Sequence, residues 1–178
     1  YIIMDGGSND NSEKIIKKYA NKLHYWQSKP DGGQTNAINE GFRHATGEIY
    51  CWLNSDDRFV DNILFKIGNI FQNNESILWL SGQTVLINEL GDILHTIVPC
   101  KNDKLTLLSK EWMIAQPSTF WSEKIWKITG GLDLRFNSAM DYDLFVKFAN
   151  ISEGFVVESI LAKAIVHAEA KTTKYSYE

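Results

Sequence analysis

Two adjacent carboxylates, Asp56 and Asp57, are the residues of this chain whose type and spacing point most directly to chemistry. They follow the apolar run from Ile49 to Leu53, whose length and composition predict a buried strand. Ligand sites of open α/β sheets lie outside the carboxyl ends of strands, so the pair is expected at such a site. Neighbouring like charges repel, and a hard cation neutralises them. The pair therefore predicts a divalent metal ion that holds a phosphorylated ligand.

Strands alternate with helices in the first 75 residues. Apolar runs predict strands at 1–4, 23–28 and 49–53, and apolar residues at helical spacing predict helices at 12–19, 34–45 and 62–71. Asp61 is expected to cap the third helix. This alternation predicts a parallel sheet with helices on both faces.

The second half of the chain has a different pattern. Strands are expected at 78–81 and 83–88, and the turn residues 89–92 lead into a further strand at 93–98, which predicts an antiparallel hairpin. Helices are then expected at 105–108, 123–129 and 141–150, and strands at 118–121, 155–157 and 160–167. The fold class is therefore α/β, with a mostly parallel sheet and a smaller antiparallel portion in the second half.

Composition narrows the classes of protein to which the chain can belong. Its 178 residues, 44% hydrophobic and 22% charged, are enough for one buried core and one domain. The net charge of -4 lacks the basic excess of nucleic-acid binders, so no nucleic-acid partner is expected. Two cysteines make no disulfide framework, which fits the reducing cytoplasm. No apolar run reaches the length of about 18 residues that a membrane span requires.

Seven short motifs, taken together and in this order, resemble the family 2 glycosyltransferases. They are DGGSND (5–10), KPDGGQ (29–34, with Ala37, Asn39 and Gly41), ATGE (45–48), LNSDD (53–57), QPSTF (116–120), GGLD (130–133) and MDYDL (140–144). The resemblance implies a GT-A fold, which is Rossmann-like, and a nucleotide-diphosphate sugar bound through Mg²⁺ or Mn²⁺. It also implies sugar transfer with inversion.

The resemblance covers nearly the whole chain and suggests how it is organised. Residues 1–178 are expected to form a single catalytic domain, with a nucleotide-binding half at 1–75 and an acceptor and catalytic half at 76–178. Family members begin with one more strand than this chain has, so we expect the domain to be truncated at its N-terminus. Such a loss would leave an exposed sheet edge.

The resemblance assigns the metal and nucleotide contacts to individual carboxylates. Asp57 matches the direct metal ligand, and Asp56 matches the residue that approaches the ribose or reaches the metal through water. Asp5, Asp31 and Asn39 match positions in the nucleotide pocket. Two of these residues have a structural alternative, because Asp5 opens a loop rich in helix-capping residues and Asp31 precedes a glycine turn.

Asp141 matches the catalytic base of the family, which removes the proton of the acceptor hydroxyl on the face opposite the leaving diphosphate. Its alternative is a capping box that starts at Ser138, and Asp143 is a rival for the base. His167 resembles a late histidine that completes the metal shell in some members, and its alternative is a structural role. Trp112 falls in the region expected to shape the acceptor and donor-sugar pocket.

These assignments lead to one functional hypothesis and two alternatives. The chain is expected to be an inverting glycosyltransferase of bacterial surface polysaccharide assembly, with a saccharide or lipid-linked saccharide as acceptor. It would act in the cytoplasm, with peripheral membrane contact if the acceptor is lipid-linked. The first alternative is a non-catalytic nucleotide- or carbohydrate-binding module. The second is a sugar nucleotidylyltransferase, although the loop at 5–10 has no basic residue to hold phosphates.

Overall fold

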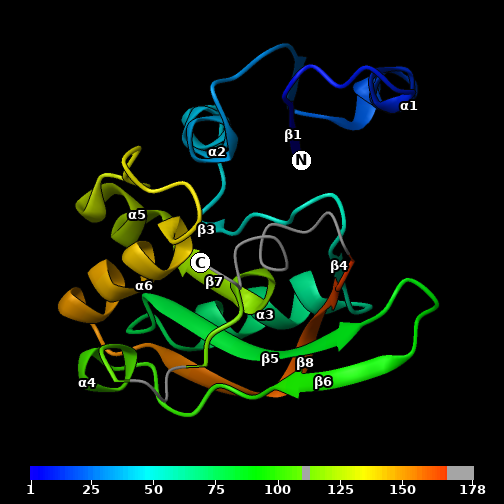
Figure 1. Ribbon diagram of the computed structural model, residues 1–178. Coiled ribbons are helices and arrows are strands. Elements are labelled where there is room, and N and C mark those ends of the chain that lie inside the picture. Colours follow the sequence, from blue (N-terminus) through cyan, green and yellow to red (C-terminus); the bar gives the residue numbers. More distant parts are fainter. Residues whose placement is uncertain (110–112, 168–178) are drawn as a thin grey trace. The chain divides into compact units, whose positions relative to one another are not determined.

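The computed structural model describes residues 1–109 and 113–167, which form two compact units (Figure 1). Unit 1 consists of residues 1–47 and 131–144, and unit 2 consists of residues 48–130 and the chain from 145 onward. Both units combine helices with strands, so the expected α/β class is confirmed.

Unit 1 is built on a pair of parallel strands. Strand β1 (Ile2–Asp5) pairs with β2 (Tyr25–Ser28), and helix α1 (Ser12–Lys18) and the short 3₁₀ helix η1 (Ala20–Lys22) connect them. Helix α2 (Gln34–Arg43) follows β2 and packs on β1. The packing is close at Gly41, where an added Cβ would lie 3.1 Å from Met4 Cγ. The predicted β-α-β-α order is therefore confirmed in this unit.

The segment 131–144 completes unit 1 through contacts with α2. The Asn39 amide donates to the carbonyl of Leu132 at 2.8 Å and accepts from the Leu132 N–H at 3.0 Å. The buried Thr35 hydroxyl donates to the carbonyl of Phe136 at 2.8 Å. These bonds satisfy backbone groups of a segment that has no strand partner, and so fix it on α2.

Unit 2 contains a mixed sheet of six strands in its described residues. The order is β3 (Ile49–Tyr50), β7 (Thr119–Ser122), β5 (Trp79–Ile87), β8 (Phe155–Ile165) and β4 (Arg58–Phe59), and β6 (Ile93–Ile97) also pairs with β5. Figure 1 shows the hairpin that joins β5 and β6, as the turn residues predicted. Strands β5 and β8 are parallel, and the other pairs are antiparallel.

Helices cover both faces of this sheet, as predicted. Leu80 and Phe120 point to one face, where they pack with Ile63 and Ile67 of helix α3 (Ile63–Asn73). The next residue of each strand points to the opposite face, because side chains alternate along a strand. There Trp79 and Trp121 pack with Phe145 and Phe148 of helix α6 (Met140–Ile151), and the ring centroids of Trp79 and Phe148 are 5.8 Å apart. Helix α4 (Lys104–Leu107), the 3₁₀ helix η2 (Gln116–Ser118) and helix α5 (Glu123–Thr129) complete the unit.

The strand pairing corrects the expectation of a mostly parallel sheet. Parallel pairing is limited to β1–β2 and β5–β8 among the described strands, because β7 returns antiparallel between β3 and β5. The strand expected at 49–53 is shorter, since β7 pairs with Ile49 and Tyr50 alone. Strands expected at 78–81 and 83–88 are one strand, β5, and those at 155–157 and 160–167 are likewise one, β8.

The start of α3 also differs from prediction. Asn62, not Asp61, holds the N-cap position, and it does so with a left-handed backbone (φ 59°) and without a side-chain capping bond. Asparagine tolerates this conformation better than most residues, which accounts for its place there. None of the helices in the described part of the chain has the length and hydropathy needed to cross a membrane.

Candidate functional site

The carboxylate pair of unit 2 lies in the loop that follows β3. The Asp57 N–H donates to the carbonyl of Asn54 at 3.1 Å, which closes a turn. The Asn54 side-chain amide donates to Asp57 Oδ2, also at 3.1 Å. The backbone turn and the side-chain bond together fix the carboxylate of Asp57 in the loop between β3 and β4, and not directly at a strand end as expected, because β3 already ends at Tyr50.

Burial and repulsion act together on Asp57. Its pKa rises from 3.8 to about 6, first because burial disfavours the charged carboxylate and then because Asp56 is a neighbouring negative charge. The hydrogen bond from Asn54 and the proximity of His167 oppose this rise. The side chain therefore sits where an added positive charge would stabilise its ionised form.

His167 reaches the carboxylate pair from the far end of the chain. Strand β8 ends at Ile165, and the Val166 N–H donates to the carbonyl of Ile87 at 2.8 Å, which holds the segment after the strand. His167 Nε2 then lies 3.0 Å from Asp56 Oδ2. Asp56, Asp57 and His167 are thus brought together within unit 2, although 111 positions separate Asp56 from the histidine.

The donor groups of this cluster fit a hard divalent cation. Within residues 1–109 and 113–167, no three side chains of His, Cys, Asp or Glu form a group that could enclose a metal on its own. Mg²⁺, however, is usually bound by one or two carboxylates together with waters and substrate phosphates. The raised pKa of Asp57 shows that burial and the charge of Asp56 disfavour its ionised form, and a bound cation would stabilise that form. Asp57 and Asp56 are the residues that fit the ion, and the metal-ligand role of His167, which contacts Asp56, stays a prediction.

In unit 1, Asp5 ends β1 beside the end of β2. Its carboxylate accepts hydrogen bonds from the hydroxyls of Ser28 at 2.6 Å and Ser8 at 2.5 Å and from the N–H groups of Gly7 and Ser8. The Ser28 bond, followed by the Ser8 bond, lowers the pKa of Asp5 below 3.8. The bonds from the loop at 5–10 show that Asp5 organises the turn that leads to α1, as its structural alternative predicted.

Asp31 lies close to this strand end. Its Oδ1 accepts from the Gly33 N–H at 2.8 Å, and its carbonyl accepts from the Asn36 amide. A Cβ added at Gly6 would lie 3.1 Å from Asp31 Oδ2, so the loop after β1 passes directly beside the carboxylate. Asp5 and Asp31 are therefore side by side at the carboxyl edge of the β1–β2 pair.

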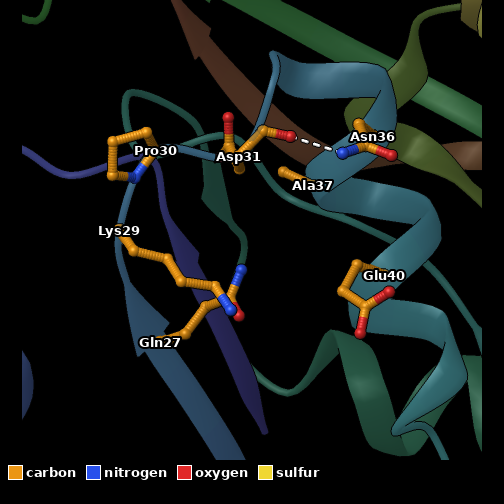
Figure 2. A pocket seen from close by; sticks show the side chains of 7 residues that line it. All are labelled: Gln27, Lys29, Pro30, Asp31, Asn36, Ala37 and Glu40. Atoms are coloured by element: carbon orange, nitrogen blue, oxygen red, sulfur yellow. Dashed lines mark hydrogen bonds between the residues drawn. The ribbon is translucent and has the colours of Figure 1, made fainter.

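A pocket of about 210 Å³ opens next to Asp31. Figure 2 shows that its wall comes from β2, the loop after it and the first turns of α2. Side chains of both charge signs line it, with Glu40 on the side of the helix and Lys29 on the side of the strand. The lining residues are Gln27, Lys29, Pro30, Asp31, Asn36, Ala37 and Glu40.

Two further predicted residues belong to unit 1. Asn39 uses both ends of its amide on the backbone of Leu132, which gives it a structural role, and its place in a nucleotide pocket stays a prediction. Asp141 lies in the first turn of α6, where burial raises its pKa and the Tyr142 N–H donates to its Oδ1 at 2.8 Å. A half-buried carboxylate that binds protons more tightly than a solvated one is suited to act as a base. Trp112 lies outside the described residues.

Comparison with known proteins decides the family. The sequence profile of the family described as "Glycosyl transferase family 2" matches residues 1–123. The chain belongs to glycosyltransferase family 2.

Bacterial proteins are among the relatives of this family 2 chain. It is 30% identical over 166 residues to an uncharacterized glycosyltransferase of Mycobacterium tuberculosis, an alignment that covers 92% of this chain and 62% of the relative. It is 24% identical over 177 residues to the chondroitin synthase of Pasteurella multocida, with 97% of this chain and 18% of that protein covered. The chain thus spans less than two thirds of the length of these relatives.

Solved structures agree with the family assignment at the level of fold. The crystal structure of TarS from S. aureus has a TM-score of 0.67 to this chain at 19% sequence identity, and the match covers 94% of this chain and 31% of that one. TarS 1–349 in complex with UDP-GlcNAc gives the same TM-score at 18% identity, with 99% and 52% covered. These likenesses confirm the expected glycosyltransferase fold.

Sequence reasoning missed part of the site in this family 2 chain. Gln27, Asn36 and Glu40 line the pocket of unit 1 but were not singled out, and Lys29 was named only as part of the motif at 29–34, without a role. Their types carry no signal of their own, because polar residues around a glycine turn are equally typical of a solvated loop. Their position could have been a signal, because Gln27 lies near the end of β2 and Lys29 in the loop after it, next to the predicted residue Asp31.

Proposed function

We propose that this family 2 glycosyltransferase transfers a sugar from a nucleotide-diphosphate sugar to a hydroxyl of a saccharide or lipid-linked saccharide, with inversion at the anomeric carbon. The observation that carries the proposal is that Asp56 and Asp57, in the loop between β3 and β4, lie together with His167, which follows β8. The two neighbouring carboxylates repel each other, and the pKa of Asp57 is raised to about 6. Such a pair is suited to bind a cation that in turn holds a diphosphate. The bacterial relatives, among them a chondroitin synthase, support a role in surface polysaccharide assembly.

The metal would be Mg²⁺ or Mn²⁺, held by Asp57 and assisted by Asp56. When bound, it supplies positive charge to the leaving diphosphate. The protein's own task at this position is orientation, since Asn54 fixes Asp57 and the imidazole of His167 fixes Asp56. This division leaves Asp57 as the ligand whose removal abolishes metal binding.

The pocket of unit 1 is proposed to take part of the nucleotide. Asp31 supplies acceptor oxygens, and Lys29 and Asn36 supply donors, so the wall offers both kinds of partner to a nucleobase edge or a ribose. The similar fold of TarS, which has been solved in complex with UDP and with UDP-GlcNAc, supports a nucleotide-sugar donor. We expect Asp31→Ala to weaken nucleotide binding.

Asp141 is proposed as the base. Inversion by direct displacement needs a group that takes the proton of the acceptor hydroxyl as the new bond to the sugar forms. Burial raises the pKa of Asp141, so its carboxylate holds that proton more strongly than a solvated aspartate would. The proton moves from the acceptor oxygen to a carboxylate oxygen of Asp141 as the acceptor oxygen bonds to the anomeric carbon. The bond between the anomeric carbon and the phosphate oxygen breaks, and the nucleoside diphosphate leaves with its electron pair.

The test measures release of nucleoside diphosphate from UDP-, GDP- and dTDP-sugars with a panel of saccharide acceptors, with and without Mn²⁺ or Mg²⁺. We expect turnover with one donor class, dependence on the cation, and a product whose anomeric configuration, read by NMR, is opposite to that of the donor. Asp57→Ala and Asp141→Asn should each lower turnover on the order of 100-fold or more. Asp61→Ala, at an exposed aspartate four positions after Asp57, is the matched control and should keep it.

Three results would overturn the proposal. Wild-type turnover by Asp57→Ala or by Asp141→Asn would remove the metal or the base from the scheme. Retention of configuration would remove direct displacement. Cation-dependent nucleotide binding without turnover, for every donor and acceptor, would favour a binding module instead.

A further inference from the structure

Gln116 is a buried polar residue whose two ends make different contacts. It starts the 3₁₀ helix η2 in unit 2 and is 7% exposed. Its Nε2 donates to the carbonyl of Trp52 at 2.8 Å, and its Oε1 accepts from Asn54 Nδ2 at 3.4 Å. Because a carbonyl can only accept, the contact with Trp52 fixes the amide so that its oxygen faces Asn54.

The orientation of Gln116 passes to the next amide. With an acceptor oxygen in front of it, the Asn54 side chain must present its NH₂ group there, and the same nitrogen donates to Asp57 Oδ2 at 3.1 Å. If Asn54 were turned over, its oxygen would face both the Gln116 oxygen and the carboxylate, which is repulsive. A hydrogen-bonded chain therefore runs from the backbone of Trp52 through two amides to the carboxylate of Asp57.

We infer that Gln116 is a positioning residue, which through Asn54 keeps Oδ2 of Asp57 occupied and leaves Oδ1 directed to a divalent cation. This role rests on the proposed function, because it assumes that Asp57 binds a metal. Residues that orient metal ligands in this way typically change metal affinity by about 10- to 100-fold when they are replaced. The side chain of Gln116 contacts Asn54 and the backbone of Trp52, so its effect on the geometry of Asp57 passes through Asn54.

A control is needed because any buried hydrogen-bonding residue also stabilises the fold. Thr119, three positions after Gln116, is fully buried, and its hydroxyl donates to the carbonyl of Ala115 at 3.0 Å. Thr119→Val removes a buried hydrogen bond from the same segment without touching Asn54 or Asp57. It therefore reproduces the structural part of the change and leaves out the orienting part.

The experiment titrates Mn²⁺ into the protein in the presence of UDP and follows the signal of free Mn²⁺ by electron paramagnetic resonance. Thermal denaturation of each variant is recorded alongside. We expect Gln116→Met to raise the dissociation constant of Mn²⁺ by about 10-fold or more. Gln116→Met and Thr119→Val should lower the melting temperature by similar amounts, because each removes a buried hydrogen bond. Thr119→Val should leave the dissociation constant of Mn²⁺ within about 2-fold of the wild type.

A second variant keeps the test decisive if Gln116→Met does not fold. Asn54 is half-buried, and Asn54→Ala removes the last link of the same chain, so it should weaken Mn²⁺ binding to the same extent. The double variant should bind Mn²⁺ no more weakly than either single variant does, since both substitutions interrupt the same series of hydrogen bonds.

The outcomes separate the two proposals. If the wild type binds Mn²⁺ and both Gln116→Met and Asn54→Ala keep its affinity, the positioning role is wrong and the metal site stands. The positioning role is also wrong if Thr119→Val weakens Mn²⁺ binding as much as Gln116→Met does. If the wild type shows no binding of Mn²⁺ with UDP, nor when the same titration is repeated with GDP and with dTDP, the metal site of the proposed function is wrong, and the role of Gln116 is overturned with it.

Discussion

Replacing Asp57 by asparagine should make the protein more stable in the absence of divalent cations. The pKa of Asp57 rises from 3.8 to about 6 through burial and the charge of Asp56. At about 1.4 kcal/mol for each pH unit, this corresponds at most to about 3 kcal/mol of destabilisation at neutral pH. Because part of the side chain is in contact with solvent, we expect about 1–2 kcal/mol. Asparagine keeps an oxygen for the amide of Asn54 and carries no charge, so it removes this cost.

The pH dependence of the gain follows from the direction of the shift. Between pH 3.8 and about 6 the native state binds more protons at Asp57 than the unfolded state does, so this group destabilises the fold as the pH rises through that window. The cost is complete at pH 7 and nearly absent at pH 4. Asp57→Asn should therefore gain about 1–2 kcal/mol at pH 7 and less than about 0.5 kcal/mol at pH 4.

Urea denaturation in a chelating buffer at both pH values measures this gain as a difference in the free energy of unfolding. The exposed Asp61→Asn is the control and should stay within about 0.5 kcal/mol of the wild type at either pH. Adding Mn²⁺ should stabilise the wild type and leave Asp57→Asn unchanged, because an ion bound by the native state alone raises its stability. A variant less stable than the wild type at pH 7, or an equal gain at pH 4, would refute the reasoning about burial and repulsion.

Three further substitutions test the packing that holds the site. Asn39→Asp keeps an acceptor for the Leu132 N–H but puts a carboxylate against the Leu132 carbonyl, so unfolding in urea should show a loss of about 2–3 kcal/mol, and an unchanged midpoint would contradict the pairing. Gly154→Ala would place a Cβ 2.5 Å from the Trp79 ring, so its melting temperature should fall by several degrees, and wild-type stability would refute the close contact. Gly68→Ala, inside α3 with open space around the new methyl group, should instead gain about 0.5–1 kcal/mol of unfolding free energy, and a loss would show that the space is filled.

Elements that depend on local signals were predictable from the sequence. The helix expected at 123–129 is α5, and Ser122 caps it by accepting from the Ile125 N–H, a signal contained in four residues. The turn at 89–92 gave the β5–β6 hairpin for the same reason. Strand ends were less predictable, since β3 ends at Tyr50, the last of its residues that pairs with β7, some 70 positions later in the chain. Apolar residues continue beyond Tyr50, but pairing decides the length of a strand.

The candidate site also combines features set by local sequence with features set by distant parts of the chain. The Asp56–Asp57 pair could be found from the apolar run before it. Its contact with His167 depends on the pairing of β8 with β4 and β5 in the sheet, and it could be expected only from the family resemblance. The amide chain from Gln116 was not predictable, because the orientation of its two amides is set by contacts between two segments more than 60 positions apart, the loop at 52–57 and η2. Asp141 kept two interpretations in the sequence, and its place in the first turn of α6 is compatible with both.

The interleaved order of the two units has a consequence for biosynthesis. Residues 1–47 leave the ribosome before residues 48–130, and the segment 131–144 that completes unit 1 follows only after them. Until that segment emerges, the amide of Asn39 on α2 lacks the backbone partner that Leu132 provides. Formation of unit 1 is therefore tied to the arrival of Leu132, and a ribosome that stalls before that codon would release a chain whose Asp31 pocket has no finished scaffold.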